Sequence, residues 1–202
     1  MVKNIDFLGH ATFRINGSKT IYFDPYQLQS DKPADVICIT HSHFDHLSLD
    51  DVKKIARRDT VIVCSKDCVE QLTPIVDQVI GMDPFQNAEV GEISIESVPA
   101  YNIDKEFHPK ENNWNGYVVA MDDSKVYHPG DTDKIPEMKA VQTDVAFLPV
   151  GGTYTMDYKE AAEAVELINP RYAIPMHYGS IVGTDSDAQK FVDLVGSRAV
   201  IM

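Results

Sequence analysis

The sequence predicts an α/β protein in which two similar halves face each other and carry their helices on the outside. Three observations lead to this class. Each half opens with strand-like segments, each continues with helices and strands in alternation, and no low-complexity stretch or Ser/Gly-rich linker separates the halves. A sheet and a helix each bury one apolar face, so two such halves pack sheet against sheet. We therefore expect one domain over residues 1–202, built as a four-layer αβ/βα sandwich of two facing mixed β-sheets with helices outside.

The chain is expected to open with an antiparallel meander. Residues 3–8 and 11–15 have strand-like patterns, and Asn16-Gly17 between the second and third segments is a strong hairpin turn signal. Residues 20–23 return as a third strand, which stops at a turn. The first three strands should therefore be neighbours in one sheet.

Helices and strands alternate through the rest of the first half. A helix is expected from Ser48 to about Arg58, because Ser48 can cap it and its acidic first turn and basic end suit the helix dipole. The other elements expected here are strands at 35–40, 60–64 and 76–82 and a brief helix at 66–72.

The second half begins with turn residues between 83 and 92. Residues 93–98 then alternate with period two, which predicts a half-buried strand. The clearest helix is expected over 157–168, where Asp157 and Glu160 have capping-box spacing and Pro170 ends the pattern. The other expected elements are strands at 116–121, 125–127, 144–150, 171–176 and 198–202 and a helix at 186–195.

Length and composition are those of an ordinary globular chain. No stretch approaches the roughly 18 apolar residues that a membrane span needs. Residues 1–4 lead directly into a strand-like segment, so we expect no signal peptide. Three cysteines, an odd number, fit a reducing compartment better than a disulfide framework. We expect a cytoplasmic protein with no membrane partner; a homo-oligomer is compatible with the composition.

The formal net charge of −13 bears on the partners of this chain. It disfavours nucleic acid, because phosphate contacts need clustered Lys and Arg side chains. It does not forbid a small anionic substrate, since bound metal ions would reverse the local potential. The expected partner is therefore a small molecule.

The most informative segment is the loop after the strand at 35–40. It offers three imidazoles and a carboxylate within six residues, His41, His43, Asp45 and His46. These groups are ligands for zinc, manganese or iron, and the absence of thiolates from the segment argues against a structural zinc site. Because one tetrahedral metal rarely takes four ligands from one loop, the spacing predicts two adjacent metals. A lone histidine is more often a surface or core residue, so the prediction depends on the cluster.

Further metal-capable side chains follow other predicted strands. His108 lies in a polar loop after the strand at 93–98, His128 and Asp131 follow the strand at 125–127, and His177 follows the strand at 171–176. If these strands run in one direction, the side chains meet at one rim, where α/β scaffolds usually build their sites.

These motifs together resemble the metallo-β-lactamase superfamily. The segments that carry the resemblance are His41-Ser42-His43-Phe44-Asp45-His46, Gly130-Asp131-Thr132 and Met176-His177-Tyr178-Gly179, with Leu8-Gly9-His10-Ala11 and Phe23-Asp24-Pro25 near the start. The last two are similar to the branch of small metal-dependent hydrolases related to ascorbate-6-phosphate lactonase and N-acyl phosphatidylethanolamine phospholipase D. The resemblance covers essentially the whole chain and implies the metallo-β-lactamase fold, but superfamily membership does not specify the substrate.

The resemblance also implies a ligand set for two metals. His41 and His43 would bind the first metal, Asp45, His46 and His177 the second, and Asp131 would bridge both. The chain departs from the pattern at the third histidine of the first site, where relatives often read Pro-Ala-x-His and this chain has Asn102. Asn102 is a weak, neutral oxygen ligand. Either His108 completes the first site, which we favour, or that site is short of a ligand and binds metal loosely.

Three further residues are candidates for supporting roles. Asp24 can accept a hydrogen bond from a ligand imidazole, or it can cap the turn at Pro25. His10 can contact the substrate or cap a strand. His128 lies three residues before Asp131 and can support it from behind.

The expected activity is metal-dependent hydrolysis. Two divalent metals, zinc before manganese or iron, would lower the pKa of bound water from near 16 to about 7 and supply hydroxide for attack on an ester, lactone or phosphodiester. Asp45 and Asp131 are the expected catalytic carboxylates, with Asp45 as the proton acceptor. Two alternatives stay open: a sensor that holds metal without turnover, suggested by Asn102, and a nuclease of the same superfamily, which the acidic balance disfavours.

Overall fold

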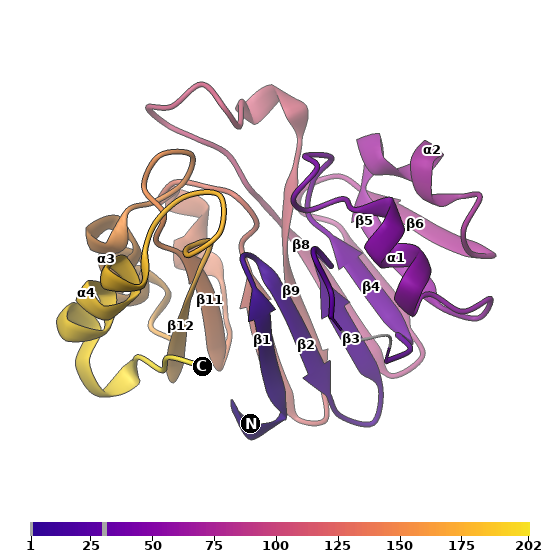
Figure 1. Cartoon of the computed structure of the whole chain (residues 1–202), viewed down its shortest axis with the longest axis horizontal. Helices are drawn as coiled ribbons and strands as arrows, with labels where there is room; N and C mark the ends of the chain where they lie inside the picture. Colours follow the sequence, from indigo (N-terminus) through magenta and orange to yellow (C-terminus); the bar gives the residue numbers. More distant parts are fainter. Residues whose placement is uncertain (1, 30–31) are drawn as a thin grey trace.

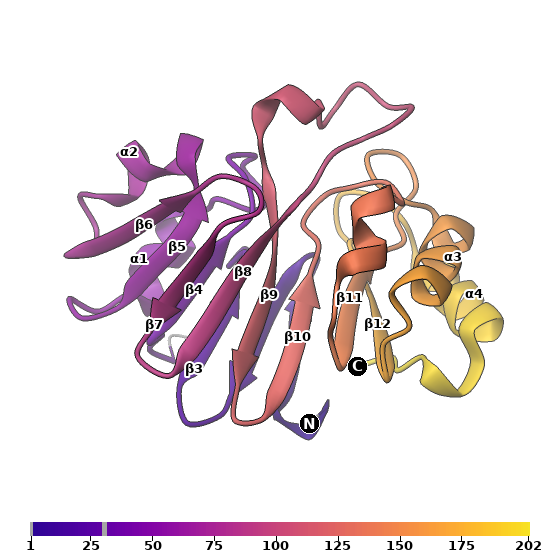
Figure 2. The ribbon, with the colours of Figure 1, turned by 180° about the vertical axis from the view of Figure 1, so that it is seen from behind.

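Two six-stranded sheets lie face to face, and helices cover their outer faces (Figures 1 and 2). The computed structural model describes residues 2–29 and 32–202. Met1, where the expected N-terminal segment begins, lies outside the described residues, as do Ser30 and Asp31. The expected four-layer arrangement of two mixed sheets with outer helices is confirmed.

The N-terminal sheet follows the order of the chain. Its first three strands form the expected antiparallel meander, and the remaining three are parallel to the third. The strands are β1 (Ile5–Gly9), β2 (Thr12–Asn16), β3 (Thr20–Phe23), β4 (Val36–Ile39), β5 (Val61–Ser65) and β6 (Gln78–Met82).

The C-terminal sheet repeats this plan in the order β12-β11-β10-β9-β8-β7. Its first four strands are antiparallel, and the last two continue parallel to β10. The strands are β7 (Asn87–Val90), β8 (Ile93–Pro99), β9 (Asn115–Met121), β10 (Ser124–His128), β11 (Val145–Pro149) and β12 (Tyr172–Met176).

The helices divide between the two outer faces. In Figure 1, α1 (Leu49–Ile55) and α2 (Val69–Leu72) lie beside the N-terminal sheet, and α3 (Tyr158–Ile168) and α4 (Asp185–Val195) lie beside the C-terminal sheet. Short 3-10 turns are η1 (Val2–Asn4), η2 (Lys66–Cys68), η3 (Lys110–Asn112), η4 (Pro136–Ala140) and η5 (Gly196–Arg198). No helix within the described ranges combines the length and hydropathy required to span a bilayer.

Three apolar cores hold the layers together. In the central core, Phe13 of β2 stacks on Phe147 of β11, with ring centroids 3.8 Å apart and an interplanar angle of 3°. Each fully buried side chain of this size contributes about 1.5–3 kcal/mol through its removal from water. The outer cores join α1 to the N-terminal sheet and α3 and α4 to the C-terminal sheet. The cysteines are buried free thiols, as expected, and burial raises their pKa.

Three local predictions were wrong. The first helix ends at Ile55 rather than near Arg58, because the Arg57 N–H donates to Thr60 Oγ1 at 2.8 Å instead of continuing the helix. Residues 87–90, expected as turns, form edge strand β7, whose pairing to β8 outweighs a polar sequence. The strand expected at 198–202 is absent: η5 ends at Arg198 and Ala199 makes only an isolated bridge with Ala173.

The topology brings the carboxyl ends of β4, β10 and β12 to one edge of the sandwich. In the N-terminal sheet β4 is parallel to β3, and in the C-terminal sheet β10 and β12 are both parallel to β11. A contact between the two sheets ties the loops together, because the Asn115 N–H donates to Thr40 O at 3.2 Å. This rim, formed by the loops at the top of Figure 1, is where the predicted site residues gather.

Candidate metal centre

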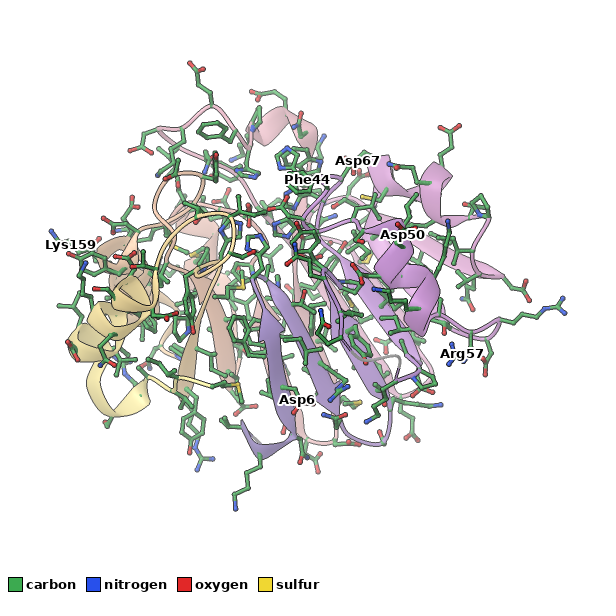
Figure 3. All side chains as sticks on the ribbon, in the orientation of Figure 1. Asp6, Phe44, Asp50, Arg57, Asp67 and Lys159 are labelled. Atoms are coloured by element: carbon green, nitrogen blue, oxygen red, sulfur yellow. The ribbon has the colours of Figure 1, made fainter. Side chains whose placement is uncertain are left out.

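The loop after β4 folds back on itself and gathers its side chains. The N–H groups of His46 and Leu47 both donate to His43 O, at 3.0 and 2.8 Å. The N–H and hydroxyl of Thr40 donate to Asp24, at 2.8 and 2.7 Å, and fix the start of the loop. The loop residue Phe44, labelled in Figure 3, is 67% exposed.

The first group of candidate ligands comprises His41, His43 and His108, whose ligand atoms lie within 4.8 Å of one another. His41 Nε2 lies 3.1 Å from His43 Nδ1. The indole of Trp114 packs beside both rings, with centroid distances of 4.8 Å to each. Trp114 is itself held by Asp67, which accepts its Nε1–H at 2.7 Å.

Asn102 lies behind His108 rather than beside His41 and His43. Its Oδ1 accepts the backbone N–H of His108 at 2.9 Å and lies 3.0 Å from His108 Nδ1. Its Nδ2 donates to Asp133 Oδ1 and to Tyr154 O, at 3.1 and 3.0 Å. Both ends of the amide are therefore occupied by protein partners, and the imidazole of His108 stands where a third nitrogen is needed.

The second group comprises His10, Asp45, His46 and His177, again with ligand atoms within 4.8 Å of one another. His10 Nε2 lies 2.9 Å from Asp45 Oδ2, and His177 Nε2 lies 4.0 Å from the same oxygen. The backbone N–H of His177 donates to His10 O at 2.7 Å, which joins the ends of β1 and β12.

Asp131 lies between the two groups. Its Oδ2 is 3.0 Å from His177 Nε2 and 3.3 Å from His108 Nε2, and its Oδ1 is 3.3 Å from His46 Nε2. The preceding residue, Gly130, has a φ of +65°, and a Cβ there would lie 3.0 Å from Thr40 Cβ. Only glycine fits this turn and this approach without strain.

Asp24 and His128 support the centre from outside. Asp24 Oδ2 lies 2.8 Å from His46 Nδ1, a bond that leaves His46 Nε2 free and fixes the ring orientation. His128 donates its Nε2–H to Ala11 O at 2.8 Å and accepts the Gly130 N–H at 3.2 Å. It therefore connects the turn after β1 to the loop that carries Asp131.

The charges at the centre suit a set of metal ligands. Burial lowers the pKa of His41 well below its usual value, and His46 adds to the effect, so the ring is neutral. Burial alone would raise the pKa of Asp131, but His177 and His46 outweigh it and hold that pKa well below the usual range. Burial would lower the pKa of His46, yet Asp131 and Asp24 hold it well above the usual value. A cation that binds His46 must therefore displace a proton.

The donor set fits divalent metal ions. Four buried atoms, His46 Nε2, His108 Nε2, His177 Nε2 and Asp131 Oδ1, make no hydrogen bond to any described residue. An unsatisfied buried polar atom costs about 1–3 kcal/mol, so four in one place require a partner. Imidazole nitrogen and carboxylate oxygen are donors for zinc, manganese and iron. Metal ions would satisfy all four atoms at once.

Sequence reasoning missed the residues that hold the loop around His108. Asp133 accepts Asn102 Nδ2–H, the Ile103 N–H at 2.8 Å and Lys105 Nζ at 2.7 Å. Its position two residues after Asp131 was the available signal. The role of Trp114 beside His41 and His43 had no sequence signal, because aromatic residues are more often core.

Comparison with known proteins agrees with this geometry. A family model for the β-lactamase superfamily domain matches residues 4–177. A UPF0173 metal-dependent hydrolase from Pyrococcus furiosus is 38% identical over 219 residues, covering 100% of this chain and 96% of that protein. The structure of a proposed metal-dependent hydrolase from Parabacteroides distasonis matches with a TM-score of 0.86 and 30% identity, over 98% of this chain and 91% of that one.

A second solved structure extends the match to archaea. Igni18, a metallo hydrolase from Ignicoccus hospitalis, has a TM-score of 0.80 and 26% identity, over 98% of this chain and 94% of that one. The match spans nearly the full length of these proteins and includes the rim that carries the histidines and aspartates. The chain therefore belongs to the metallo-β-lactamase superfamily and, within it, to the UPF0173 family of metal-dependent hydrolases.

Proposed function

We propose that this protein is a two-metal hydrolase that cleaves a small carboxylic ester, lactone or phosphodiester. The position of Asp131 supports the proposal most directly. Its two oxygens lie within 3.0–3.3 Å of imidazole nitrogens from both candidate groups, as a bridging carboxylate requires. A single-metal site would have no use for a carboxylate shared in this way.

The residues divide into two ligand sets. His41, His43 and His108 would hold the first metal, Asp45, His46 and His177 would hold the second, and Asp131 would contribute to both. The nitrogen and oxygen donors favour zinc and permit manganese or iron. Two bound divalent ions would lower the pKa of a water molecule from near 16 to about 7 and polarise the substrate oxygen.

Side chains next to the candidate ligands orient the histidine rings and cover one side of the site. Asp24 and Asn102 fix the rings of His46 and His108, and Trp114 covers one side of His41 and His43. Asp45 is the residue we assign to proton transfer. Its side chain is 11% exposed, against 3% for Asp131, and His10 donates to its Oδ2.

The presence of His108 supports hydrolysis over metal sensing. The sensor alternative was motivated by Asn102 in a ligand position, and the geometry offers His108 as a full nitrogen donor there. For partners we propose a small molecule rather than nucleic acid, on the strength of the net charge of −13.

Substitution of the shared carboxylate tests the proposal. Asp131→Ala should reduce bound metal from two equivalents per chain to one or fewer. It should also lower kcat/KM by more than about 10–100-fold, the loss expected when a residue that only supports a ligand is removed. Elemental analysis and turnover of p-nitrophenyl esters and bis-p-nitrophenyl phosphate provide the measurements. Asp123→Ala, in the exposed turn between β9 and β10, is the matched control and should keep metal and turnover. Unchanged metal content in Asp131→Ala would remove the basis of the proposal.

A further inference from the structure

A cavity of about 520 Å³ opens beside the metal centre. It lies between the end of β1, the loop after β3 and the loop that joins β12 to α4. Its lining includes Phe7, His10, Tyr26, Gln27, Tyr178 and Asp185.

The cavity meets the candidate ligands at His10. This side chain is 3% exposed, its Nε2 lies 2.9 Å from Asp45 Oδ2, and its ring centroid is 4.1 Å from that of His177. Tyr178 directly follows His177 in the chain. A molecule whose reacting bond lies at the metal centre could therefore extend past His10 into this space.

Aromatic rings form part of the cavity wall, and the rest of the lining is largely polar, with Gln27, Gln29 and Ser180. Tyr178 stacks on Phe7, with ring centroids 5.7 Å apart and planes at 28°, and the Tyr26 ring lies 5.8 Å from that of His10. Tyr26 accepts a hydrogen bond from Gln27 Nε2 at 3.1 Å, so the polar groups on this wall are neutral. Tyrosine rings of this kind offer apolar faces with a hydroxyl at one edge.

No lysine or arginine lines the cavity among the described residues. The ionisable residue at its mouth is an acid, Asp185. A phosphate or carboxylate placed here would meet no positive partner and would face a carboxylate. Charge therefore favours a neutral occupant.

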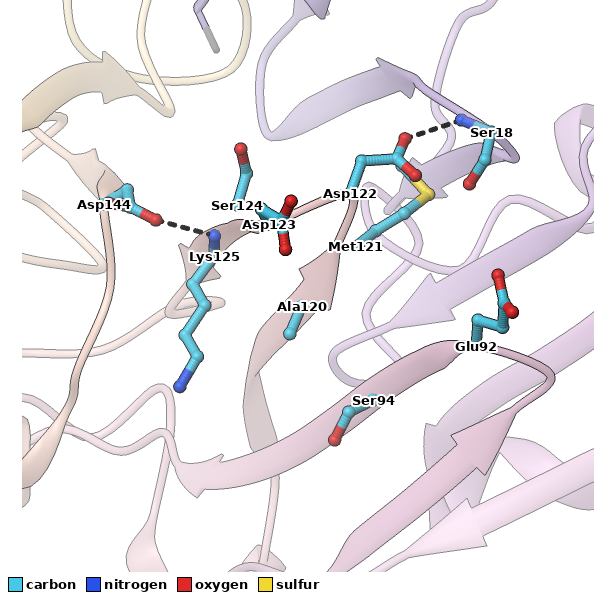
Figure 4. Close-up of a pocket in the computed structure, with 10 residues that line it drawn as sticks. All are labelled: Ser18, Glu92, Ser94, Ala120, Met121, Asp122, Asp123, Ser124, Lys125 and Asp144. Atoms are coloured by element: carbon cyan, nitrogen blue, oxygen red, sulfur yellow. Dashed lines mark hydrogen bonds between the residues drawn. The ribbon is translucent and has the colours of Figure 1, made fainter.

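A second large cavity serves as a contrast. It measures about 570 Å³ and includes Asp122, Asp123, Lys125 and Asp144 (Figure 4). It lies at the turn that opens β10, whereas His128 and the metal rim are at the other end of that strand. Two of its carboxylates support the fold, since Asp122 accepts the Ser18 N–H and Asp144 accepts the Lys125 N–H. It has no connection to the proposed chemistry.

We propose that the cavity beside His10 binds the uncharged, ring-bearing part of the substrate, between Tyr26 and Tyr178. This inference rests on the proposed hydrolase function and narrows its substrate class. The scissile bond belongs to a molecule whose non-reacting arm is neutral and carries a ring, and a phosphate or carboxylate on that arm disfavours binding.

Matched esters test the charge and shape of the arm. The metal-loaded protein is given p-nitrophenyl acetate, phenylacetate and hemisuccinate, which share one leaving group and differ only in the arm. We expect kcat/KM for the phenylacetate to exceed that for the acetate by about tenfold through burial of the ring, and the hemisuccinate to be the poorest of the three. A hemisuccinate preference, or equal rates for acetate and phenylacetate, would overturn the inference.

Substitutions in the cavity test whether the preference for phenylacetate over acetate arises there. Tyr178→Ala and Tyr26→Ala, from two separate segments, should each bring the phenylacetate-to-acetate ratio of kcat/KM towards one. Tyr158→Ala, in α3 on the outer face, makes the same change away from the cavity and should keep the wild-type ratio. An unchanged ratio in both cavity variants would place the ring elsewhere and sink the proposal.

A binding measurement separates this inference from the proposed function. Saturation-transfer NMR with phenylacetamide, a neutral amide, reports occupancy without turnover. If the loaded protein hydrolyses neither these esters nor bis-p-nitrophenyl phosphate, the proposed function fails, while phenylacetamide binding that Tyr178→Ala abolishes still supports the cavity assignment. Absence of phenylacetamide binding, or equal binding by the anionic succinamate, contradicts it.

Discussion

At the scale of single residues, three candidate ligands follow one rule: the protein engages Nδ1 and leaves Nε2 for the metal. His46 Nδ1 lies 2.8 Å from Asp24 Oδ2, His41 Nδ1 lies 2.9 Å from Thr40 Oγ1, and His108 Nδ1 lies 3.0 Å from Asn102 Oδ1. An acceptor at Nδ1 fixes the tautomer and the ring orientation and raises the basicity of Nε2. These three acceptors therefore orient the candidate ligands and tune their basicity.

Asn102 should act on metal binding through His108. Asn102→Ala removes the acceptor for His108 Nδ1 and N–H. Metal affinity at the group formed by His41, His43 and His108 should therefore fall by about 10–100-fold. In a His108→Ala background the same change should add little, because residues that act through one another are not additive. Metal titration of the single and double variants provides the measurement. Asn112→Ala, an exposed amide in the same loop, is the control. Additive losses would show that Asn102 acts independently of His108.

At the scale of elements, turns at strand ends deliver the site. His10 and His177 end their strands with φ of +53° and +59°, in the left-handed region that few side chains adopt. The bond from His177 N–H to His10 O couples the two turns. The loop after β3 is held from the other side, because Asp51 of α1 accepts the N–H groups of Gln27 and Leu28 at 2.8 and 3.0 Å.

Asp51 should make stability depend on pH. Burial alone would raise the pKa of Asp51, but hydrogen bonds from Lys54, Ser48, Gln27 and Leu28 outweigh it and lower that pKa. A lowered folded pKa gives stability that is present above the unfolded value of about 3.9 and is lost as pH falls through the folded value. Asp51→Asn should therefore lower the free energy of unfolding by about 1 kcal/mol or more at pH 7, and by progressively less as the pH falls below about 4.

Urea denaturation at pH 7, 5 and 3.5 measures this difference. Asp50→Asn provides the control, since it removes the same charge from the neighbouring, exposed position in α1 (Figure 3). If the difference in the free energy of unfolding between Asp51→Asn and the wild type stays constant across this pH range, the carboxylate contributes no charge-dependent bond.

At the scale of the molecule, the sandwich and its rim followed from local patterns, but the details of the rim did not. Apolar periodicity and capping residues predicted nearly every strand and both long helices, because these signals lie within one element. The position of Asn102 behind His108 depends on Asp133 and Tyr154, which come from two other loops. Strand β7 was missed for the same reason, since pairing along β8 decides it and its own sequence is polar. The proposed branch of lactonases and phospholipases stays a prediction.

Metal removal should weaken the whole fold, because the centre joins both sheets. Without ions, four buried ligand atoms from four loops lack hydrogen-bond partners. Metal at about 100 times its Kd stabilises the folded state by about 2.7 kcal/mol, which corresponds to a Tm change of about 5–10 °C for a chain of this size. Calorimetry before and after dialysis against EDTA should show that loss, and added zinc should reverse it. Asp131→Ala should show little response to EDTA, because its centre is already incomplete. An identical Tm for the loaded and EDTA-treated wild type would mean that bound metal does not connect the two sheets energetically.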